Sequence, residues 1–277
     1  MELPAEAASV TSQFLDLIDA SAPGLVSGLY LHGSLSFGEY FPGQSDVDFA
    51  AVLSHRPDEG ELESLAVAHA AVATAHPLPH FDGIHLLRED LAGPPEECPE
   101  LPVMFEGNFS PSTRNSGVNP VTWHELARQA AVVRGPALTE QDVWTDDAAL
   151  RAFTHANLSS YWAGWPPALA EHSEHANAEW TAAWCVLGVS RLHHLLATGA
   201  MTSKSGAGRY AISAFGPQWQ HIATEALRIR ELPAEPSLYA DPAERGRDVI
   251  AFASMAIDSG LALGSVAGAR QSVGSGA

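Results

Sequence analysis

The chain has 277 residues, 46% of them hydrophobic, which is enough for two modest domains with a sizeable core. Acidic residues outnumber basic residues by 33 to 14, and the formal net charge is −19. Binding of nucleic acid needs clustered lysine and arginine, so this charge argues against a nucleic-acid partner. It suits a cationic small substrate through electrostatic steering, and it equally suits solubility alone.

The N-terminus and the cysteines predict a cytoplasmic protein that binds no membrane. The first residues are acidic and lack the basic region of a signal peptide, and no apolar run approaches the length of a membrane span. The two cysteines, Cys98 and Cys185, are too few for a disulfide framework. We therefore expect a protein of the reducing cytoplasm, and we expect it to be a monomer.

The first half of the chain alternates helices and strands. Apolar periodicity predicts helices over residues 5–20 and 59–75. Strands are predicted over residues 25–31, 46–53 and 81–87. Residues 91–119 are rich in proline and glycine, and we expect a long irregular loop there. Thr122 is the predicted N-cap of the next helix, in a capping box with Glu125. A short strand at 131–133 closes this domain near residue 140.

Strand signals are absent from the sequence beyond residue 141, which predicts an all-helical second domain. Its helices are expected over residues 142–170, 171–198, 202–215, 217–231 and 242–263. Pro166–Pro167 should break or kink the first of these helices, and Gly199 should cap the second. Residues 264–277, rich in glycine, serine and alanine, are predicted to be a disordered tail. The domains are thus predicted at 1–140 and 141–263.

A Gly-Ser turn and an Asp-x-Asp strand lie close together in the first domain. Gly33 and Ser34 follow an apolar strand, and Asp46 and Asp48 share one face of the next. Two carboxylates on one face of an apolar strand are costly unless a cation lies between them. Hard oxygen ligands favour Mg²⁺, particularly beside substrate phosphates. Gly33 permits close approach to a phosphate, and Ser34 adds a hydroxyl and an N–H.

This pattern resembles the signature of the nucleotidyltransferase superfamily, whose founding member is a DNA polymerase. The resemblance implies a mixed α/β (α+β) domain in which a third carboxylate comes from the next strand of the sheet. That carboxylate either completes the metal site or takes the proton of the attacking hydroxyl. Asp82 is the only acid of the third predicted strand and so becomes the candidate, although an exposed aspartate at a strand start is the alternative. His85 is a second possible base, but we expect it to be a half-buried structural histidine.

The helical half carries a second ordered pattern. Ser190–Arg191 lies near the end of one predicted helix, Thr198–Gly199 at its stop, and Lys204, the only lysine beside thirteen arginines, a few residues later. This order resembles the helical domain of aminoglycoside adenylyltransferases of the streptomycin/spectinomycin type. In that family the matching arginine and lysine reach across the interdomain cleft to the nucleotide triphosphate. The resemblance therefore assigns Arg191 and Lys204 to nucleotide binding.

One stretch of the helical half departs from the streptomycin-modifying members of this family. Those enzymes place acidic residues, which bind the cationic drug, in the helix before that arginine. Residues 177–184 of this chain contain Glu179 as their only acid. Trp180 and Trp184 lie one helical turn apart and can wall a pocket, although core packing is the commoner role of such a pair. Spectinomycin, or another hydroxylated small molecule, is therefore favoured over streptomycin.

These patterns together predict an Mg²⁺-dependent adenylyltransferase that transfers AMP from ATP to a hydroxyl of a small cationic molecule. The resemblance implies an aminoglycoside or aminocyclitol acceptor and hence antibiotic resistance. The Asp-x-Asp pair would hold Mg²⁺, the Gly-Ser turn would cradle the β and γ phosphates, and Asp82 would act as the base. Two alternatives remain. The acceptor is a protein side chain or another natural product, or the chain is a catalytically silent nucleotide-binding homologue.

Overall fold

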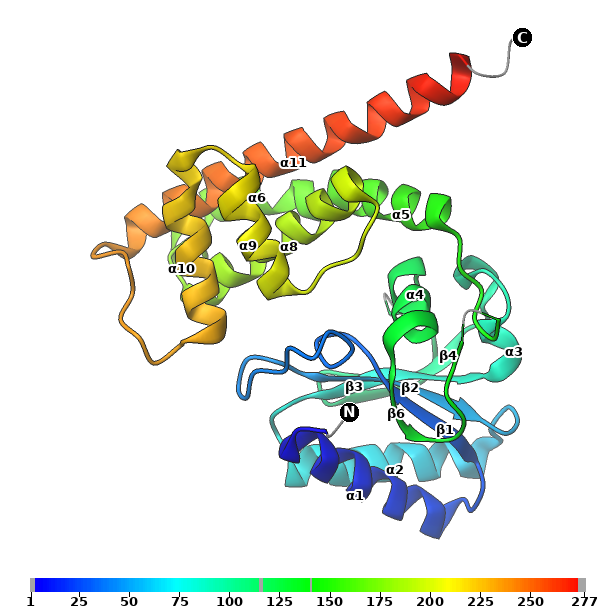
Figure 1. The fold of residues 1–277 in the computed structure, drawn as a ribbon. Helices are drawn as coiled ribbons and strands as arrows, with labels where there is room; N and C mark the ends of the chain where they lie inside the picture. Colours follow the sequence, from blue (N-terminus) through cyan, green and yellow to red (C-terminus); the bar gives the residue numbers. More distant parts are fainter. Residues whose placement is uncertain (1–2, 115–116, 140, 274–277) are drawn as a thin grey trace. The chain divides into compact units, whose positions relative to one another are not determined.

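The computed structural model describes residues 3–114, 117–139 and 141–273. The chain forms two compact units, Met1–Asp146 and Asp147–Ala277, each with hydrophobic core of its own (Figure 1). The sequence placed this boundary near residue 140. Across the described ranges, no helix combines the length and apolar character that crossing a membrane requires.

A six-stranded mixed sheet organises the first unit, with the strand order β5-β4-β3-β2-β1-β6. Its strands are β1 (Val26–Leu31), β2 (Val47–Leu53), β3 (Phe81–Leu87), β4 (Leu101–Phe105), β5 (Asn108–Thr113) and β6 (Ala131–Arg134). Strands β2 and β3 run parallel, and each other neighbouring pair runs antiparallel. The parallel pair is the one that carries the candidate acids, so the register between these two strands decides how those acids meet.

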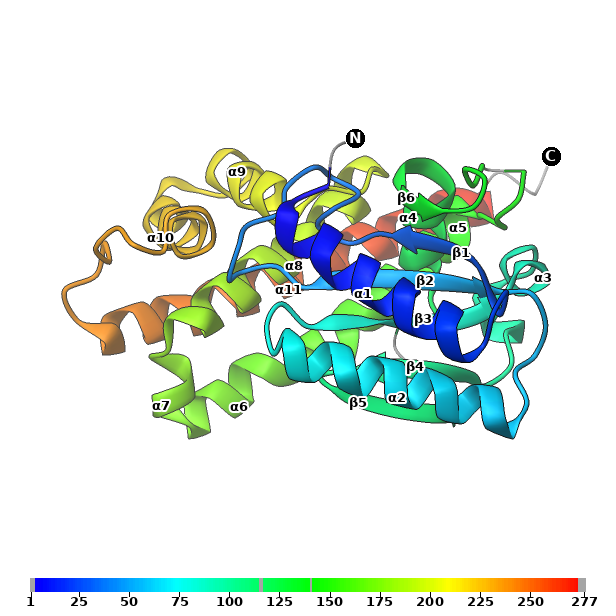
Figure 2. The ribbon, with the colours of Figure 1, turned by 90° about the horizontal axis from the view of Figure 1, so that it is seen from below.

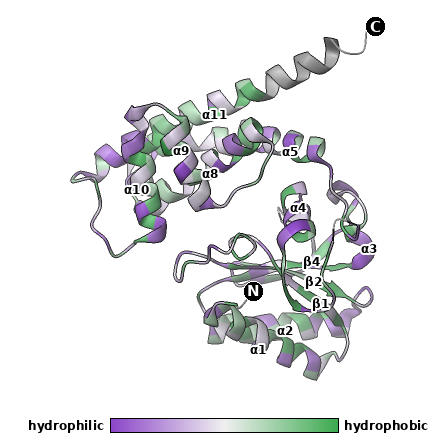
Figure 3. Cartoon of the chain, viewed as in Figure 1, coloured by the Kyte–Doolittle hydropathy of each residue, from purple (hydrophilic) through white to green (hydrophobic). Residues whose placement is uncertain are grey.

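Helices cover both faces of this sheet. Helices α1 (Ala5–Ser21) and α2 (Glu59–Ala75) lie along one face of the sheet (Figure 2), and Phe49 of β2 is buried in the core between them and the sheet. Both helices carry hydrophobic residues, green in Figure 3, and hydrophilic residues, purple. Helix α4 (Pro120–Gln129) packs on the other face against alternate residues of β1, β2 and β3. Successive strand residues point to opposite faces, so Asp48, next to Phe49, lies on the α4 face.

A β-hairpin replaces much of the irregular loop expected over residues 91–119. Strands β4 and β5 pair there around a turn at Glu106 and Gly107, whose φ angles are 47° and 77°. Two positive φ angles in succession match the turn geometry that favours hairpins. The prediction was wrong because Pro102 and Pro111 interrupt the strand pattern, and proline is depleted in strands. A short helix α3 (Arg88–Leu91) and a 3-10 turn (Pro95–Glu97) precede the hairpin.

Helix α4 begins before the predicted cap at Thr122. Asn119 is the N-cap, and its side-chain oxygen accepts the N–H groups of Val121 at 2.8 Å and Thr122 at 3.1 Å. Pro120 takes the first helical position, which suits its fixed φ and missing N–H. The predicted capping box is therefore wrong, and Glu125 lies inside the helix, where it is buried.

The second unit contains helices and no strand among its described residues. Its helices are α5 (Asp147–Ser159), α6 (Trp165–Glu171), α7 (Ser173–Ala176), α8 (Glu179–Thr198), α9 (Lys204–Ala214), α10 (Gln220–Glu231) and α11 (Pro242–Val273), with 3-10 turns at Trp162–Gly164 and Pro217–Trp219. Helix α8 contacts α5, α9, α10 and α11 and forms the centre of this unit. Gly199 ends α8 in the left-handed conformation with φ of 77°, which confirms the predicted cap.

The helix predicted over residues 142–170 is broken near Pro166–Pro167, as expected, and the predicted tail differs from the structure. Helix α5 ends at Ser159 and α6 begins at Trp165, so the prolines lie in the first turn of α6, where proline fits. Of the predicted tail, residues 264–277, the part up to Val273 continues helix α11. Alanine favours helix strongly, while glycine and serine only weaken it, so this composition does not end the helix. Residues 274–277 lie outside the described residues.

Candidate functional site

The predicted acids of the first unit lie at neighbouring positions of the parallel strands. Asp48 of β2 and Asp82 of β3 are direct partners in the sheet register, and both are half-buried on the α4 face. Asp46 is exposed and directly precedes β2, which begins at Val47, so it does not lie within the strand as predicted. The structure therefore brings the acid of the third strand beside the Asp-x-Asp pair.

Asp82 has the protonation behaviour of a base that works near neutral pH. Burial, helped by the charges of Asp46 and Asp48, raises the pKa of Asp82 to about 6, against the lowering effects of the Glu106 N–H and of His80. The Glu106 N–H donates to Asp82 Oδ1 at 2.9 Å. This N–H belongs to the hairpin turn that the sequence analysis missed. A general base is most effective when its pKa is close to the working pH.

His85 packs inside the protein and is more deeply buried than the half-buried histidine expected. It is fully buried on the α1 and α2 face of β3, the face opposite Asp82. Its Nε2 lies 3.0 Å from Nε2 of His69, and its Nδ1 lies 3.1 Å from the carbonyl oxygen of Pro102. Burial lowers the pKa of His85 to about 4. The ring is therefore uncharged at neutral pH and has both nitrogens engaged.

The chemistry of the acids fits Mg²⁺ shared with a nucleotide. Within the part of the chain that the structure describes, no group of three or more His, Cys, Asp and Glu side chains is placed to hold a metal ion. Mg²⁺ is usually bound by one or two carboxylates together with substrate phosphates and waters, rather than by a complete protein cage. Asp46 and Asp48 supply two such carboxylates.

The Gly33–Ser34 turn lies directly against Asp48. Gly33 has φ of 59°, and a Cβ atom on it would lie 2.1 Å from Asp48 Oδ2, so glycine is required for both reasons. The N–H of His32 donates to the carbonyl oxygen of Asp48 at 3.0 Å. The Ser34 hydroxyl is buried and finds no hydrogen-bond partner among the described residues. A buried polar group left in this way is costly, and a ligand oxygen would satisfy it.

The N–H of Gly33 is bonded within the protein. It donates to Glu125 Oε2 at 3.0 Å, and the same oxygen lies 3.2 Å from His32 Nδ1. Burial lowers the pKa of His32, but the carboxylates of Glu125 and Asp48 outweigh burial and bring the pKa above its usual value. Glu125 was not predicted as a site residue, because a local capping rule accounted for its position. The available signal was an acid within a helix segment that is otherwise buried, residues 122–127.

Arg191 and Lys204 lie on two helices of the second unit that pack against each other. Arg191 is in α8, and Lys204 is the first residue of α9, directly after the N-cap Ser203. Both side chains are half-buried. The Lys204 ammonium lies 5.1 Å from the centroid of the Trp184 ring, which is within the range of a cation–π interaction. Lys204 thus has a structural contact beside any role toward a nucleotide.

Trp180 and Trp184 belong to an aromatic cluster with Trp162 and Trp165. The Trp184 ring centroid lies 5.5 Å from that of Trp162, and the Trp165 centroid lies 6.3 Å from that of Trp180. Trp180 is 54% exposed, whereas the Trp184 indole N–H is buried with no hydrogen-bond partner in the described ranges. Trp184 therefore packs against the core, whereas Trp180 lies at the surface.

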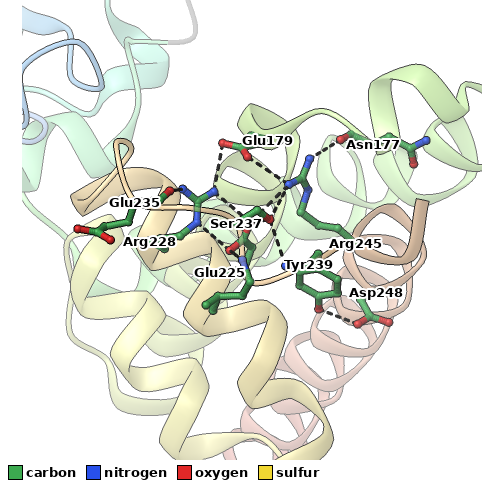
Figure 4. Close-up of polar contacts among 10 residues, drawn as sticks. Asn177, Glu179, Glu225, Arg228, Glu235, Ser237, Tyr239, Arg245 and Asp248 are labelled. Carbon is green, nitrogen blue, oxygen red and sulfur yellow. Dashed lines mark hydrogen bonds and ion pairs between the residues drawn. The ribbon is translucent and has the colours of Figure 1, made fainter. Parts of the chain in front are cut away.

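Glu179, the acid of the stretch 177–184, is paired with two arginines (Figure 4). Its carboxylate oxygens lie 3.1 Å from Arg228 Nη2 and 3.3 Å from Arg245 Nη1. Both arginines also bind Glu225, at 2.8 Å and 3.4 Å, and the Glu225 side chain is fully buried. The charge of Glu179 is thus compensated inside the protein, which makes it a poor ligand for a cationic drug.

Comparison with known proteins gives a match in structure and none in sequence. No protein-family model matches the chain, and no curated protein matches it. Among solved structures, the chain is similar to the crystal structure of spectinomycin adenyltransferase AAD(9) from Enterococcus faecialis with ATP and spectinomycin. The TM-score is 0.66 at 13% identity, over 91% of this chain and 99% of that chain. The two proteins share a fold. The predicted fold class is confirmed, as is the resemblance behind it at the level of fold.

This fold places the predicted residues in two groups. The Gly33–Ser34 turn, Asp48 and Asp82 come together in the first unit, with Asp46 at the start of β2. Arg191 and Lys204 belong to the helical unit, so their part in the same site stays a prediction.

Proposed function

We propose that the protein is an Mg²⁺-dependent nucleotidyltransferase that transfers AMP from ATP to a hydroxyl of a small molecule. The observation that carries this proposal is the meeting of Asp48, Asp82 and the Gly33 turn on one face of the sheet. The spectinomycin adenyltransferase of the same fold, which was solved with ATP, supports the choice of nucleotide.

Each residue of the first unit has a defined part in the proposed reaction. Asp46 and Asp48 would hold Mg²⁺, which when bound neutralises the triphosphate and polarises the α-phosphate. The buried Ser34 hydroxyl donates to a β- or γ-phosphate oxygen, while Gly33 lets the chain pass close to the phosphates. Asp82 accepts the proton of the acceptor hydroxyl as its oxygen attacks the α-phosphorus in line, and the bond to pyrophosphate breaks.

The helical unit supplies positive charge for the leaving group in this proposal. Arg191 and Lys204 would neutralise pyrophosphate as it departs, because preorganised cations stabilise charge that develops in the transition state. Lysine is the rarer choice in this chain, with thirteen arginines against the single Lys204. A compact ammonium differs from a planar guanidinium in the geometry of its contacts, so the position calls for a direct test.

The proposed acceptor is an aminocyclitol hydroxyl, with spectinomycin preferred over streptomycin. Streptomycin carries two guanidinium groups, and a site that buries them needs several acids, because an unpaired buried charge is costly. Glu179 is paired with Arg228 and Arg245, so it does not supply such an acid. Spectinomycin is smaller and less charged. The net charge of −19 attracts either cation and does not discriminate between them.

Mass spectrometry of each drug after incubation with the protein, ATP and Mg²⁺ tests this proposal. We expect spectinomycin to gain the mass of one AMP. A gain on streptomycin alone would reverse the preference. No mass gain on either drug, from a protein that binds MgATP, would point to another natural product or to a protein side chain as the acceptor. Mg²⁺-dependent ATP binding in calorimetry without AMP transfer to any acceptor would identify a catalytically silent nucleotide-binding homologue.

A further inference from the structure

Helix α4 holds the Gly33–Ser34 turn at two points that lie one helical turn apart. Glu125 Oε2 accepts the Gly33 N–H at 3.0 Å, and Gln129 Nε2 donates to Ser36 Oγ at 3.5 Å. The Ser36 hydroxyl in turn donates to the carbonyl oxygen of Gly33 at 2.8 Å. Residues four positions apart lie on the same side of a helix, so one side of α4 fixes both backbone polar groups of Gly33.

Glu125 is buried at a position where an ionised carboxylate costs free energy. Its side chain is 4% exposed, and the adjoining Trp123 and Leu126 belong to the hydrophobic core beneath the sheet. Burial of an ionised carboxylate costs free energy unless hydrogen bonds and charges compensate it. The Gly33 N–H and the imidazole of His32, the residue directly before the turn, are two groups that compensate it. An apolar residue would pack in the core equally well and would leave the Gly33 N–H without this acceptor.

The position of the turn matters because no free space separates it from Asp48. A single added carbon on Gly33 would lie 2.1 Å from Asp48 Oδ2. A small displacement of the turn therefore changes its distance to the Asp48 carboxylate and moves the Ser34 hydroxyl at the same time. Displacements of about 1 Å in such sites can cost roughly a hundredfold in rate.

We propose that Glu125 is a positioning residue of the nucleotide site, which holds the Gly33–Ser34 turn at the distance from Asp48 at which both bind MgATP. This inference rests on the proposed function. Glu125 acts through the N–H of Gly33 and the ring of His32, and not by contact with the nucleotide. Its negative charge would repel a phosphate in direct contact. In this proposal the Gly33–Ser34 turn therefore lies between the Glu125 carboxylate and the phosphates.

Three variants in helix α4 test this role. Glu125→Ala removes the acceptor, and Glu125→Gln keeps an oxygen that can accept the Gly33 N–H while removing the charge. Trp123→Phe is the matched control, because Trp123 is buried in the same helix and its indole N–H donates to the carbonyl oxygen of Gly93 at 3.2 Å, away from the turn. Calorimetry measures MgATP affinity, and amide hydrogen exchange at Gly33 reports on the hydrogen bond itself.

We expect Glu125→Ala to weaken MgATP binding about tenfold and to speed exchange of the Gly33 amide. Glu125→Gln should lose less on both measures, since it retains the acceptor. Trp123→Phe should lower the melting temperature and leave both measures unchanged. Gln129→Ala should act in the same direction as Glu125→Ala but more weakly, because its 3.5 Å contact is long. It keeps the proposal testable if Glu125→Ala does not fold.

The outcomes separate this inference from the proposed function. Wild-type affinity in Glu125→Ala would overturn the positioning role alone. An equal loss of affinity in Trp123→Phe would overturn it as well, because the effect would then follow from general destabilisation of α4. A wild-type protein that does not bind MgATP would overturn the proposed function, and the role of Glu125 at a nucleotide site would fall with it.

Discussion

Asp82 in the first unit is half-buried, and Glu225 in the helical unit is fully buried. The pKa values of these two acids shift in opposite directions. Burial, with the charges of the Asp-x-Asp pair, raises the pKa of Asp82 to about 6. Burial also acts to raise the pKa of Glu225, but hydrogen bonds, led by that from Arg228, outweigh it and hold the pKa at about 2. The difference lies in the neighbours, which are acids in one case and arginines in the other.

This contrast separates two uses of buried charge. Around Glu225, Figure 4 shows a network in which Arg228 and Arg245 join helices α10 and α11 to the start of α8. Ser237, in the connection between α10 and α11, also donates to Glu225 at 2.6 Å. The charges of this network are balanced within the unit, and its contacts connect three of the helices. Asp48 of β2 and Asp82 of β3 instead repel each other when both are ionised. Such clustered carboxylates are the arrangement expected of a site that binds a cation.

Removal of one acid from the first unit should have the largest effect on activity and none on folding. We expect Asp46→Asn or Asp48→Asn to lower AMP transfer by at least about a hundredfold, because a metal-binding carboxylate is lost. The melting temperature without metal should hold or rise, since repulsion is relieved. Asp19→Asn is the control, because Asp19 pairs with Arg134 at 2.7 Å in an exposed ion pair. Near-wild-type turnover in either site variant would show that the metal assignment is wrong.

Removal of the acid from the helical unit should have the opposite profile. Glu225→Gln removes the buried carboxylate of Arg228 and Arg245 and, among the described residues, leaves them the half-exposed Glu179 alone as an acidic partner. Loss of one partner of a buried ion pair costs about 3–5 kcal/mol of unfolding free energy. The control is Glu231→Gln in the same helix, because Glu231 pairs with the exposed Arg209 and such surface pairs contribute about 0–1 kcal/mol. Urea unfolding measures both. Equal destabilisation by the two variants would show that the network around Glu225 has no special role.

Lowering the pH should remove the difference in stability between the wild-type protein and Glu225→Gln. This direction follows from the lowered pKa of Glu225. The folded-state pKa of Glu225, about 2, lies below its ordinary value of 4.5. Its stabilising contribution is therefore complete above pH 4.5 and disappears as the pH falls toward 2. The stability of the wild-type protein and that of Glu225→Gln should converge over this interval. A constant difference down to pH 2 would mean that the carboxylate charge does not contribute.

The activity should respond to pH through Asp82 at a higher value. A base must be deprotonated, so kcat/KM should rise as the pH increases through about 6, by about tenfold per pH unit below that point. Bound Mg²⁺ would lower this midpoint, because a cation favours the carboxylate. His80 lowers the pKa of Asp82, so His80→Gln should move the midpoint upward. An activity that is flat between pH 5 and 7 would contradict the assignment of Asp82 as the base.

Local sequence patterns predicted much of the fold. They did not predict which residues far apart in the sequence contact each other. Helix α2 was predicted with its observed bounds because its apolar residues lie within one segment. Asp82 became a candidate because it is the only acid of the third predicted strand, where the resemblance implies a further carboxylate, and the structure places it opposite Asp48. The role of Glu125 depends on Gly33, which lies more than ninety residues away, as the pairing of Glu179 depends on arginines of α10 and α11. No periodicity or capping rule connects residues over such distances.

The smallest effect is expected at Lys204, where the contrast between structural and functional charge is closest. Its ammonium stands over Trp184, and an interaction of this kind contributes about 0.5–1 kcal/mol to stability. If Lys204 also binds the triphosphate, Lys204→Ala should weaken ATP binding about tenfold, as expected for loss of a charge-assisted contact. Lys204→Arg should weaken it less, because the charge remains while its geometry changes. Arg209→Ala, in the same helix, is the control, and calorimetry with MgATP is the measurement. Unchanged ATP affinity in Lys204→Ala would remove Lys204 from the site and leave it a purely structural partner of Trp184.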